Sequence, residues 1–237
     1  MAQGTITSGY PNELTKVDKS TWADSSVEVN SRGYLKVQGR SVMEMWQKEY
    51  MAEFAKAVAS KGGRILEVGF GMGLSASAIQ KYPIDEHMII EPNNTIFETL
   101  KLFAKKASNK VVGVHGMWQE VINDKELFHP NSFDGIFFDA SPFDKKELHQ
   151  RQFQFGKLAW NLLKKGGTYA YCNLCSIGYL KDKYNNWDNL FRKTQLPGLK
   201  QAGFKENDIM YKVIKVDSPQ NHPKYQHNEA LVITAIK

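Results

Sequence analysis

Short apolar runs alternate with longer amphipathic segments through most of the chain, and this alternation constrains the fold more than any other feature. We expect strands at residues 64–68, 87–90, 110–114, 133–138 and 168–174. We expect helices at residues 42–60, 95–106, 118–122, 146–163 and 187–202. One more helix should follow the first strand and end at residue 80. Strands that alternate with helices in this way are typical of right-handed crossover units and a mostly parallel sheet.

The two ends of the chain break the alternation. Residues 209–216 and 230–236 are strand-like runs with no helix between them, so we expect them to pair antiparallel at one edge. The predicted fold class is therefore α/β, with a mostly parallel seven-stranded sheet and an antiparallel C-terminal edge. Residues 1–40 are polar and broken by glycine, and we interpret them as an irregular N-terminal arm or lid before one domain over residues 41–237. Trp22 in this arm either docks onto the core or closes over a ligand.

The composition excludes several classes of protein. Of the 237 residues, 42% are hydrophobic and 24% are charged, as in average globular domains. No apolar run approaches the ~20 residues of a membrane-spanning helix, and the N-terminus lacks a signal-peptide pattern. Two cysteines do not build a disulfide framework, so we expect a reduced, cytoplasmic protein without membrane contact. Lysine and arginine number 31 against 25 acidic residues, but the lysines are scattered, which gives little support to nucleic-acid binding.

A glycine-rich turn follows the first predicted strand. Glu67 is followed by glycines at 69, 71 and 73, which allow a sharp turn and a close approach to a ligand. Glu91 ends the second predicted strand, 22 positions after Gly69, where a carboxylate accepts hydrogen bonds from ribose hydroxyls. A dinucleotide and S-adenosylmethionine both carry a ribose. The turn lacks the full G-x-G-x-x-G spacing, which disfavours a nicotinamide enzyme. The E-x-G-x-G form is similar to the first motif of class I S-adenosylmethionine-dependent methyltransferases.

A carboxylate also ends the fourth predicted strand. Asp139 lies at its carboxyl end, where ligands bind in open α/β sheets, and it is our candidate for orienting or deprotonating the reacting atom. Asp134 lies at the start of the same strand, and we expect a structural role for it. Trp118 follows the third strand and either stacks on a base or packs in the core.

The cysteine and histidine residues do not indicate a metal site. Cys172 and Cys175 form one C-x-x-C pair, which is too few ligands for zinc. We expect Cys172 in a strand and Cys175 in the following loop. The six histidines have no metal-ligand spacing, and we predict no metal cofactor.

Several longer stretches resemble the guanidinoacetate N-methyltransferase family of class I methyltransferases. They are residues 42–51, 61–72 (with EVGFGM), 83–87 (PIDEH), 133–136, 171–174 (YCNL) and 202–204, within a match over about residues 34–215. The resemblance implies a Rossmann-like fold and methyl transfer from S-adenosylmethionine, which leaves S-adenosylhomocysteine. It implies cofactor contacts by Trp22, Met51, Gly69, Phe70, Gly71, Met72, Gly73, Leu74, Ser75, Glu91, Pro92, Asn93, Trp118, Gln119 and Asp139. It implies acceptor contacts by Met43, Gln47, Asp139, Leu174 and Cys175.

The sequence departs from the family pattern at two polar positions. Gln47 replaces a family glutamate that pairs with the guanidinium, and Gln119 replaces an acid beside the adenine. The first change gives up on the order of 1–2 kcal/mol of binding to a cation. The residues after Asp139, Ala140 and Ser141, are also smaller than those of the family.

These departures leave the acceptor open among guanidinoacetate, another guanidino compound and a different small amine. A nucleic-acid methyltransferase and a non-catalytic binding module are further alternatives. We expect a small-molecule substrate, no nucleic-acid or membrane partner, and a monomer or weak homodimer.

Overall fold

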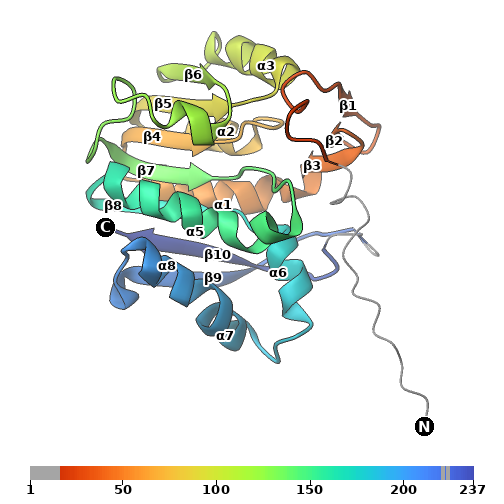
Figure 1. The fold of residues 1–237 in the computed structure, drawn as a ribbon, viewed down its shortest axis with the longest axis vertical. Helices are drawn as coiled ribbons and strands as arrows, with labels where there is room; N and C mark the ends of the chain where they lie inside the picture. The colour runs from red at the N-terminus through yellow and green to blue at the C-terminus, as the bar shows by residue number, and fades with distance from the viewer. Residues whose placement is uncertain (1–16, 220–221, 223–224) are drawn as a thin grey trace.

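A computed structural model describes residues 17–219, 222 and 225–237, and these residues form two sheets. The large sheet has seven strands in the order β6-β5-β4-β7-β8-β10-β9 (Figure 1). The strands of this sheet are β4 Gly63–Val68, β5 Ile84–Glu91, β6 Val111–His115, β7 Phe133–Phe138, β8 Leu163–Tyr171, β9 Ile209–Lys215 and β10 Glu229–Ile236. Strands β4 to β8 pair in parallel, whereas β10 pairs antiparallel with both β8 and β9. The predicted fold class is confirmed.

Helices cover both faces of this sheet because β7 is apolar on both sides. Phe137 stacks on Phe54 of α1 (Lys48–Ala59) with ring centroids 5.0 Å apart. The next residue, Phe138, stacks on Phe155 of α5 (Lys145–Leu162) at 4.6 Å. Successive side chains of a strand point to opposite faces, so these two pairs fix α1 behind the sheet and α5 in front (Figure 1).

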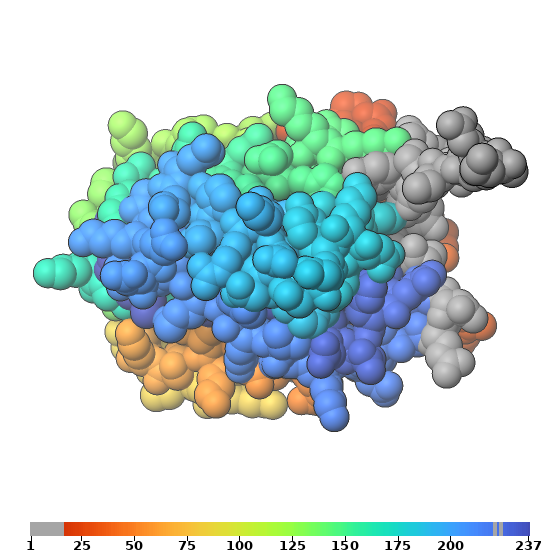
Figure 2. All heavy atoms as spheres, turned by 90° about the horizontal axis from the view of Figure 1, so that it is seen from below, coloured from red at the N-terminus to blue at the C-terminus, as the bar shows by residue number. Residues whose placement is uncertain are grey.

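The remaining helices are shorter. They are α2 Leu74–Ile79, α3 Asn94–Ala104, α4 Trp118–Val121, α6 Leu174–Lys181, α7 Trp187–Leu190, a π-helical turn Phe191–Gln195, α8 Leu196–Ala202 and a 3-10 turn Glu206–Asp208. The C-terminal part of the chain covers the lower side of the molecule in Figure 1, and Figure 2 shows that side directly as a cyan-to-blue surface. None of the described helices is long and apolar enough to cross a bilayer.

The segment before α1 differs from the prediction. A small antiparallel sheet contains β1 Val27–Val29, β2 Tyr34–Val37 and β3 Arg40–Glu44, followed by a 3-10 turn, Met45–Gln47. The predicted irregular arm is therefore wrong over these strands, and the predicted helix start at residue 42 is wrong because α1 begins at Lys48. The chain reverses through Gln38 (φ 52°) and Gly39 (φ 73°), which is the geometry of a two-residue hairpin. Glutamine is an unusual residue there, so the sequence carried a weak hairpin signal. Residues 1–16 of the predicted arm lie outside the described residues.

Helix α6 was not predicted. Strand β8 ends at Tyr171, so the predicted strand extends three residues too far and Cys172 lies just after the strand rather than in it. Because α6 begins at Leu174, Cys175 lies in the first turn of a helix rather than in a loop. Gly178 interrupts the segment and lowers its helix propensity, which explains why the pattern was missed. The predicted helix at 187–202 is present, but the π-helical turn divides it.

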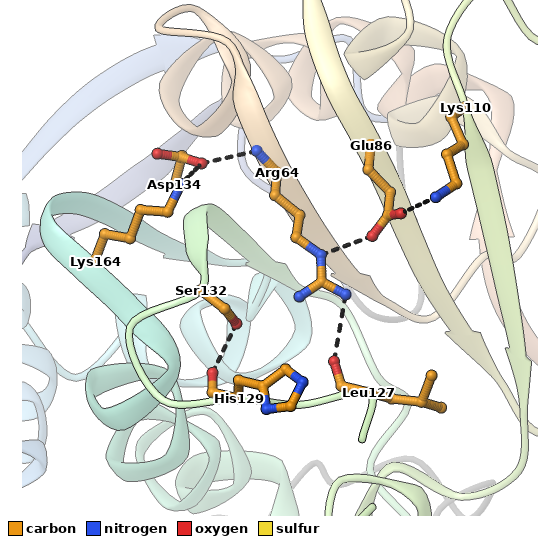
Figure 3. Close-up of polar contacts among 8 residues, drawn as sticks. All are labelled: Arg64, Glu86, Lys110, Leu127, His129, Ser132, Asp134 and Lys164. Atoms are coloured by element: carbon orange, nitrogen blue, oxygen red, sulfur yellow. Dashed lines mark hydrogen bonds and ion pairs between the residues drawn. The ribbon is translucent and has the colours of Figure 1, made fainter. Parts of the chain in front are cut away.

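The amino ends of the parallel strands are joined by polar contacts far from their carboxyl ends (Figure 3). Asp134 Oδ2 accepts the backbone N–H of Arg64 at 2.8 Å and lies 2.7 Å from Lys164 Nζ. Arg64 in turn pairs with Glu86 at 2.6 Å. Asp134 thus holds β4, β7 and β8 together, as expected for a structural residue.

Candidate active site

A pocket of about 710 Å³, including its open mouth, lies at the carboxyl ends of β4, β5 and β7. Glu91 ends β5 and Asp139 follows β7, and both line this one pocket. In Figure 1 the arrows of these strands point toward the side on which β1, β2 and β3 lie.

The glycine turn brings two segments close together. Gly69 has φ +95°, and a Cβ there would lie 2.5 Å from the carbonyl oxygen of Asp139. Gly71 has φ +55° and packs against Met43, whose sulfur accepts the backbone N–H of Met72 at 3.3 Å. The turn therefore needs glycine for its left-handed backbone and for these close approaches.

Glu91 joins the second strand to this turn. One carboxylate oxygen accepts the backbone N–H of Phe70 at 3.0 Å, and the other accepts that of Asn93 at 2.9 Å. Burial raises the pKa of Glu91, although these backbone hydrogen bonds oppose the rise. Each carboxylate oxygen can accept a second hydrogen bond, so hydroxyl donors in the pocket have sites to bind.

A polar network lies beneath the turn. Ser75 donates a hydrogen bond to Glu67, and His87 Nε2 lies 2.9 Å from the other Glu67 oxygen. Glu67, Ser75 and His87 are all fully buried. Their contacts support the turn from below, and the Ser75 side chain does not line the pocket.

The predicted cofactor residues divide into two groups. Those that line the pocket are Trp22, Gly69, Gly71, Glu91, Pro92, Trp118, Gln119 and Asp139. Those that do not line it are Met51, Phe70, Met72, Gly73, Leu74, Ser75 and Asn93. Asn93 caps α3 and donates to the carbonyls of Trp22 and Ser25, each at 2.9 Å, so it holds the N-terminal segment against the pocket.

Two aromatic residues frame the pocket. Trp22 is only 3% exposed and meets the Phe143 ring edge-on at 5.2 Å. Trp118 packs edge-on against Phe138 and Phe155. Trp118 therefore packs on the core and also lines the pocket, and its stacking on a base stays a prediction.

The side chain of Gln119 provides an acceptor that an adenine could use. Its Oε1 atom is buried and has no hydrogen-bond partner among the described residues. A buried acceptor without a donor is costly, and an amino group such as that of adenine satisfies it.

The carboxyl group of Asp139 has a pKa above the ordinary value of an aspartate. Burial raises the pKa of its carboxyl to about 6, although the Arg151 charge and a hydrogen bond from Cys172 lower it. A carboxyl with a pKa near neutrality is suited to proton transfer, and such shifts cluster at active sites.

A second pocket of about 280 Å³, including its open mouth, is lined by all four residues predicted to contact only the acceptor. Met43, Gln47, Leu174 and Cys175 line it together with Ser41, Val42, Glu44, Trp46, His222 and Tyr225. Val42 and Met43 line both pockets, so the two adjoin at β3. Gln47 Oε1 accepts the backbone N–H of Glu44 at 3.0 Å, which leaves its amide NH₂ as a donor.

Glu44 holds the walls of this second pocket together. Its carboxylate accepts hydrogen bonds from Ser41 at 2.5 Å and Trp46 at 2.6 Å, and its Oε2 lies 2.8 Å from His222 Nε2. Burial alone would raise the pKa of Glu44, but the hydrogen bonds from His222, Ser41 and Trp46 lower it below its ordinary value. Among the described residues, no group of three or more His, Cys, Asp or Glu side chains is arranged to hold a metal ion.

Some pocket residues escaped the sequence analysis. Arg151 and Glu147 line the first pocket, and Glu44 and His222 line the second. Arg151 had a recognisable signal, because it lies between Leu148 and Phe155 on the buried face of α5, where an apolar residue is expected. His222 had none, since it lies in a stretch without periodicity.

Solved structures share this fold. Spermidine synthase from Thermotoga maritima superposes with a TM-score of 0.60 at 15% identity, over 89% of this chain and 68% of that one. An O-methyltransferase from Bacillus cereus, solved with S-adenosylhomocysteine, gives a TM-score of 0.52 at 15% identity over 82% of each chain. The chain therefore has the Rossmann-like methyltransferase fold.

The family follows from the sequence comparison. The model of the guanidinoacetate N-methyltransferase family matches residues 14–237, and the chain belongs to that family. Curated relatives include protein arginine N-methyltransferase 2 of Aspergillus oryzae (29% identical over 79% of this chain and 44% of that protein) and of Kluyveromyces lactis (26%, over 68% and 40%). The chain spans less than half the length of these relatives.

Proposed function

We propose that this methyltransferase methylates a nitrogen of a small guanidino compound, guanidinoacetate or an analogue. The observation that carries the proposal is that Met43, Gln47, Leu174 and Cys175 line one pocket, which adjoins the pocket containing Glu91 and Asp139. The family match supports it.

The residues of the first pocket fit the cofactor. Glu91 would accept the ribose hydroxyls, Gln119 the adenine amino group, and the turn around Gly69 and Gly71 would receive the methionine end. When bound, S-adenosylmethionine supplies an electrophilic methyl group on a positively charged sulfur.

The acceptor side requires alignment and removal of a proton. A guanidinium has no free lone pair, so it must lose a proton as the new bond forms. Asp139, at the edge of the first pocket, would take that proton, a role worth ~10²–10⁴-fold in rate. Gln47 and the start of α6 would hold the acceptor in line with the methyl group, and such positioning is worth up to ~7–11 kcal/mol.

The decisive experiment is mass spectrometry of an acceptor panel incubated with enzyme and S-adenosylmethionine. The panel contains guanidinoacetate, methylguanidine, glycine, methylamine and an arginine-containing peptide, and the signal is a gain of one methyl group. Methylation of guanidinoacetate supports the proposal, whereas methylation of glycine or methylamine alone points to a different small amine. Methylation of the peptide alone would support protein arginine as substrate, the second candidate suggested by the names of the curated relatives.

The pH dependence should follow the Asp139 carboxyl. Since its pKa is about 6, the base is protonated and inactive below that value. We expect kcat/KM to fall about tenfold per pH unit below pH ~6 and to reach a plateau above it. A pH–rate profile with guanidinoacetate checks this, and a profile flat through pH 6 would remove Asp139 as the titrating base.

Changing Gln47 to Glu should favour cationic acceptors. A carboxylate can still accept the backbone N–H of Glu44 and adds a charge beside the acceptor. We expect the KM for a guanidinium acceptor to fall about 10- to 30-fold, the equivalent of ~1–2 kcal/mol. Steady-state kinetics with methylguanidine test this, with Lys48→Gln at the neighbouring exposed position as the control. An unchanged or higher KM would exclude a guanidinium near residue 47.

A further inference from the structure

The wall of the second pocket includes a histidine from the far end of the chain. His222 lies between β9 and β10, is 5% exposed, and lines this pocket together with Glu44, Gln47 and Tyr225. Its ring meets the Trp46 ring edge-on, with centroids 5.7 Å apart. A residue 178 positions from Glu44 therefore forms part of the wall that the methyl acceptor would face.

The two ring nitrogens of His222 have different roles. Nδ1 accepts the backbone N–H of Tyr225 at 3.1 Å, so this nitrogen carries no proton. The ring proton therefore lies on Nε2, which is 2.8 Å from Glu44 Oε2 and donates to it. Because the hydrogen bond to one nitrogen sets the role of the other, Tyr225 keeps His222 in the form that binds the carboxylate.

Glu44 connects His222 to Gln47. These two residues form a capping box, in which the Glu44 side chain accepts the backbone N–H of Gln47 and Gln47 Oε1 accepts that of Glu44 at 3.0 Å. Ser41, Trp46 and His222 also donate to the Glu44 carboxylate, which fills its roughly four acceptor sites. The carboxylate is therefore committed to holding the 3-10 turn, and the side chain of Gln47 is left to face the methyl acceptor.

We propose that His222 is a positioning residue for the methyl acceptor, which acts by holding Glu44 and, through it, Gln47. This inference rests on the proposed function and adds a residue that sets the affinity for the methyl acceptor. Loss of the Nε2 donor would leave the buried Glu44 carboxylate without one charge-assisted hydrogen bond, so the turn that carries Gln47 would be held less firmly. Binding of S-adenosylmethionine should not change, because neither His222 nor Glu44 lines the first pocket.

Two substitutions separate the roles of the ring nitrogens. His222→Gln places an N–H donor near the position of Nε2, whereas His222→Asn places an acceptor near that of Nδ1. We expect His222→Asn to raise the KM for guanidinoacetate about three- to tenfold with kcat within twofold, and His222→Gln to keep both constants within twofold of the wild type. Calorimetry should give equal affinities for S-adenosylmethionine. His227→Asn is the matched control, because His227 lies in the same segment and lines neither pocket.

A double substitution tests whether the effect passes through Gln47. In a Gln47→Ala background, His222→Asn should change the KM for guanidinoacetate less than twofold, because the side chain that it positions is gone. Independent effects that multiply in the double variant would show that His222 does not act through Gln47, and the inference would then fail.

Other outcomes also overturn the inference. A wild-type KM in His222→Asn, or a larger loss in His222→Gln than in His222→Asn, would make His222 a support of the C-terminal segment only. Weaker binding of S-adenosylmethionine in either variant contradicts it as well. If His222→Asn fails to fold, as thermal melting would reveal, Glu44→Gln decides, because it weakens the same contact from the other side and should raise the KM by a similar factor.

Hydrogen exchange tests the same link without turnover. By nuclear magnetic resonance, the protection of the Gln47 backbone amide should fall in His222→Asn and persist in His222→Gln. Equal protection in both variants and the wild type would show that His222 does not hold this turn. If the wild type methylates no guanidine, the proposed function fails, whereas the exchange measurement still decides whether His222 positions Gln47.

Discussion

Replacing Asp139 with Asn should lower kcat by about 10²- to 10⁴-fold, the usual contribution of a general base. The amide keeps the size of the side chain and loses its ability to take a proton. The amide oxygen can still accept the hydrogen bond from Cys172, whereas the electrostatic contact with Arg151 depends on the carboxylate, so some local adjustment is expected. Single-turnover kinetics at saturating S-adenosylmethionine isolate the chemical step from binding.

Asp134→Asn provides a matched control for this experiment. It changes the same residue type at the opposite end of β7, where Asp134 contacts Arg64 and Lys164. It should lower the stability and leave kcat within twofold of the wild type. An Asp139→Asn enzyme with wild-type turnover and bound cofactor would show that Asp139 is not the base.

Replacing Glu91 with Gln should weaken S-adenosylmethionine binding about 10- to 100-fold. The carboxylate is 4% exposed and already accepts backbone N–H groups of Phe70 and Asn93. Gln has one acceptor oxygen in place of two, so the turn or the ribose loses a charge-assisted hydrogen bond worth ~1.5–3 kcal/mol. Isothermal titration calorimetry with S-adenosylmethionine measures the effect.

Glu86→Gln is the corresponding control, because Glu86 lies in the same strand β5 and pairs with Arg64 and Lys110 at the far end. It should leave the cofactor affinity unchanged. Equal affinities for the Glu91→Gln protein and the wild type would place the ribose elsewhere in the pocket.

The central sheet could be predicted because each strand contains a short apolar run, although β5 and β8 begin earlier than that run and so earlier than predicted. The carboxyl-end positions of Glu91 and Asp139 followed from the same reasoning, since parallel strands bring their ends to one edge. The hairpin through Gln38 and Gly39 was missed because its turn lacks the usual Asn-Gly pair. The predicted start of α1 was too early because Met43 and Trp46 continue the helical spacing of Tyr50 and Phe54. In the structure Met43 lies in β3 and pairs with Leu35 of β2.

The pocket was only partly predictable. Met51 and Phe70 were predicted to contact the cofactor but do not line the pocket. Sequence spacing does not separate a residue that lines a pocket from one that supports it. The contact between Glu44 and His222 joins residues 178 positions apart. No local pattern reports such a contact, because tertiary packing alone brings the two segments together.

The shared position of Met43 has a practical consequence for redesign. Together with Val42, it lines both the pocket proposed for the methyl donor and the pocket proposed for the acceptor. Enlarging or shrinking it should therefore alter recognition of both reactants at once. Gln47 and Cys175 line the pocket proposed for the acceptor and not the pocket proposed for the donor. Mutant libraries that seek new acceptors while keeping the affinity for the methyl donor should therefore begin with those two positions.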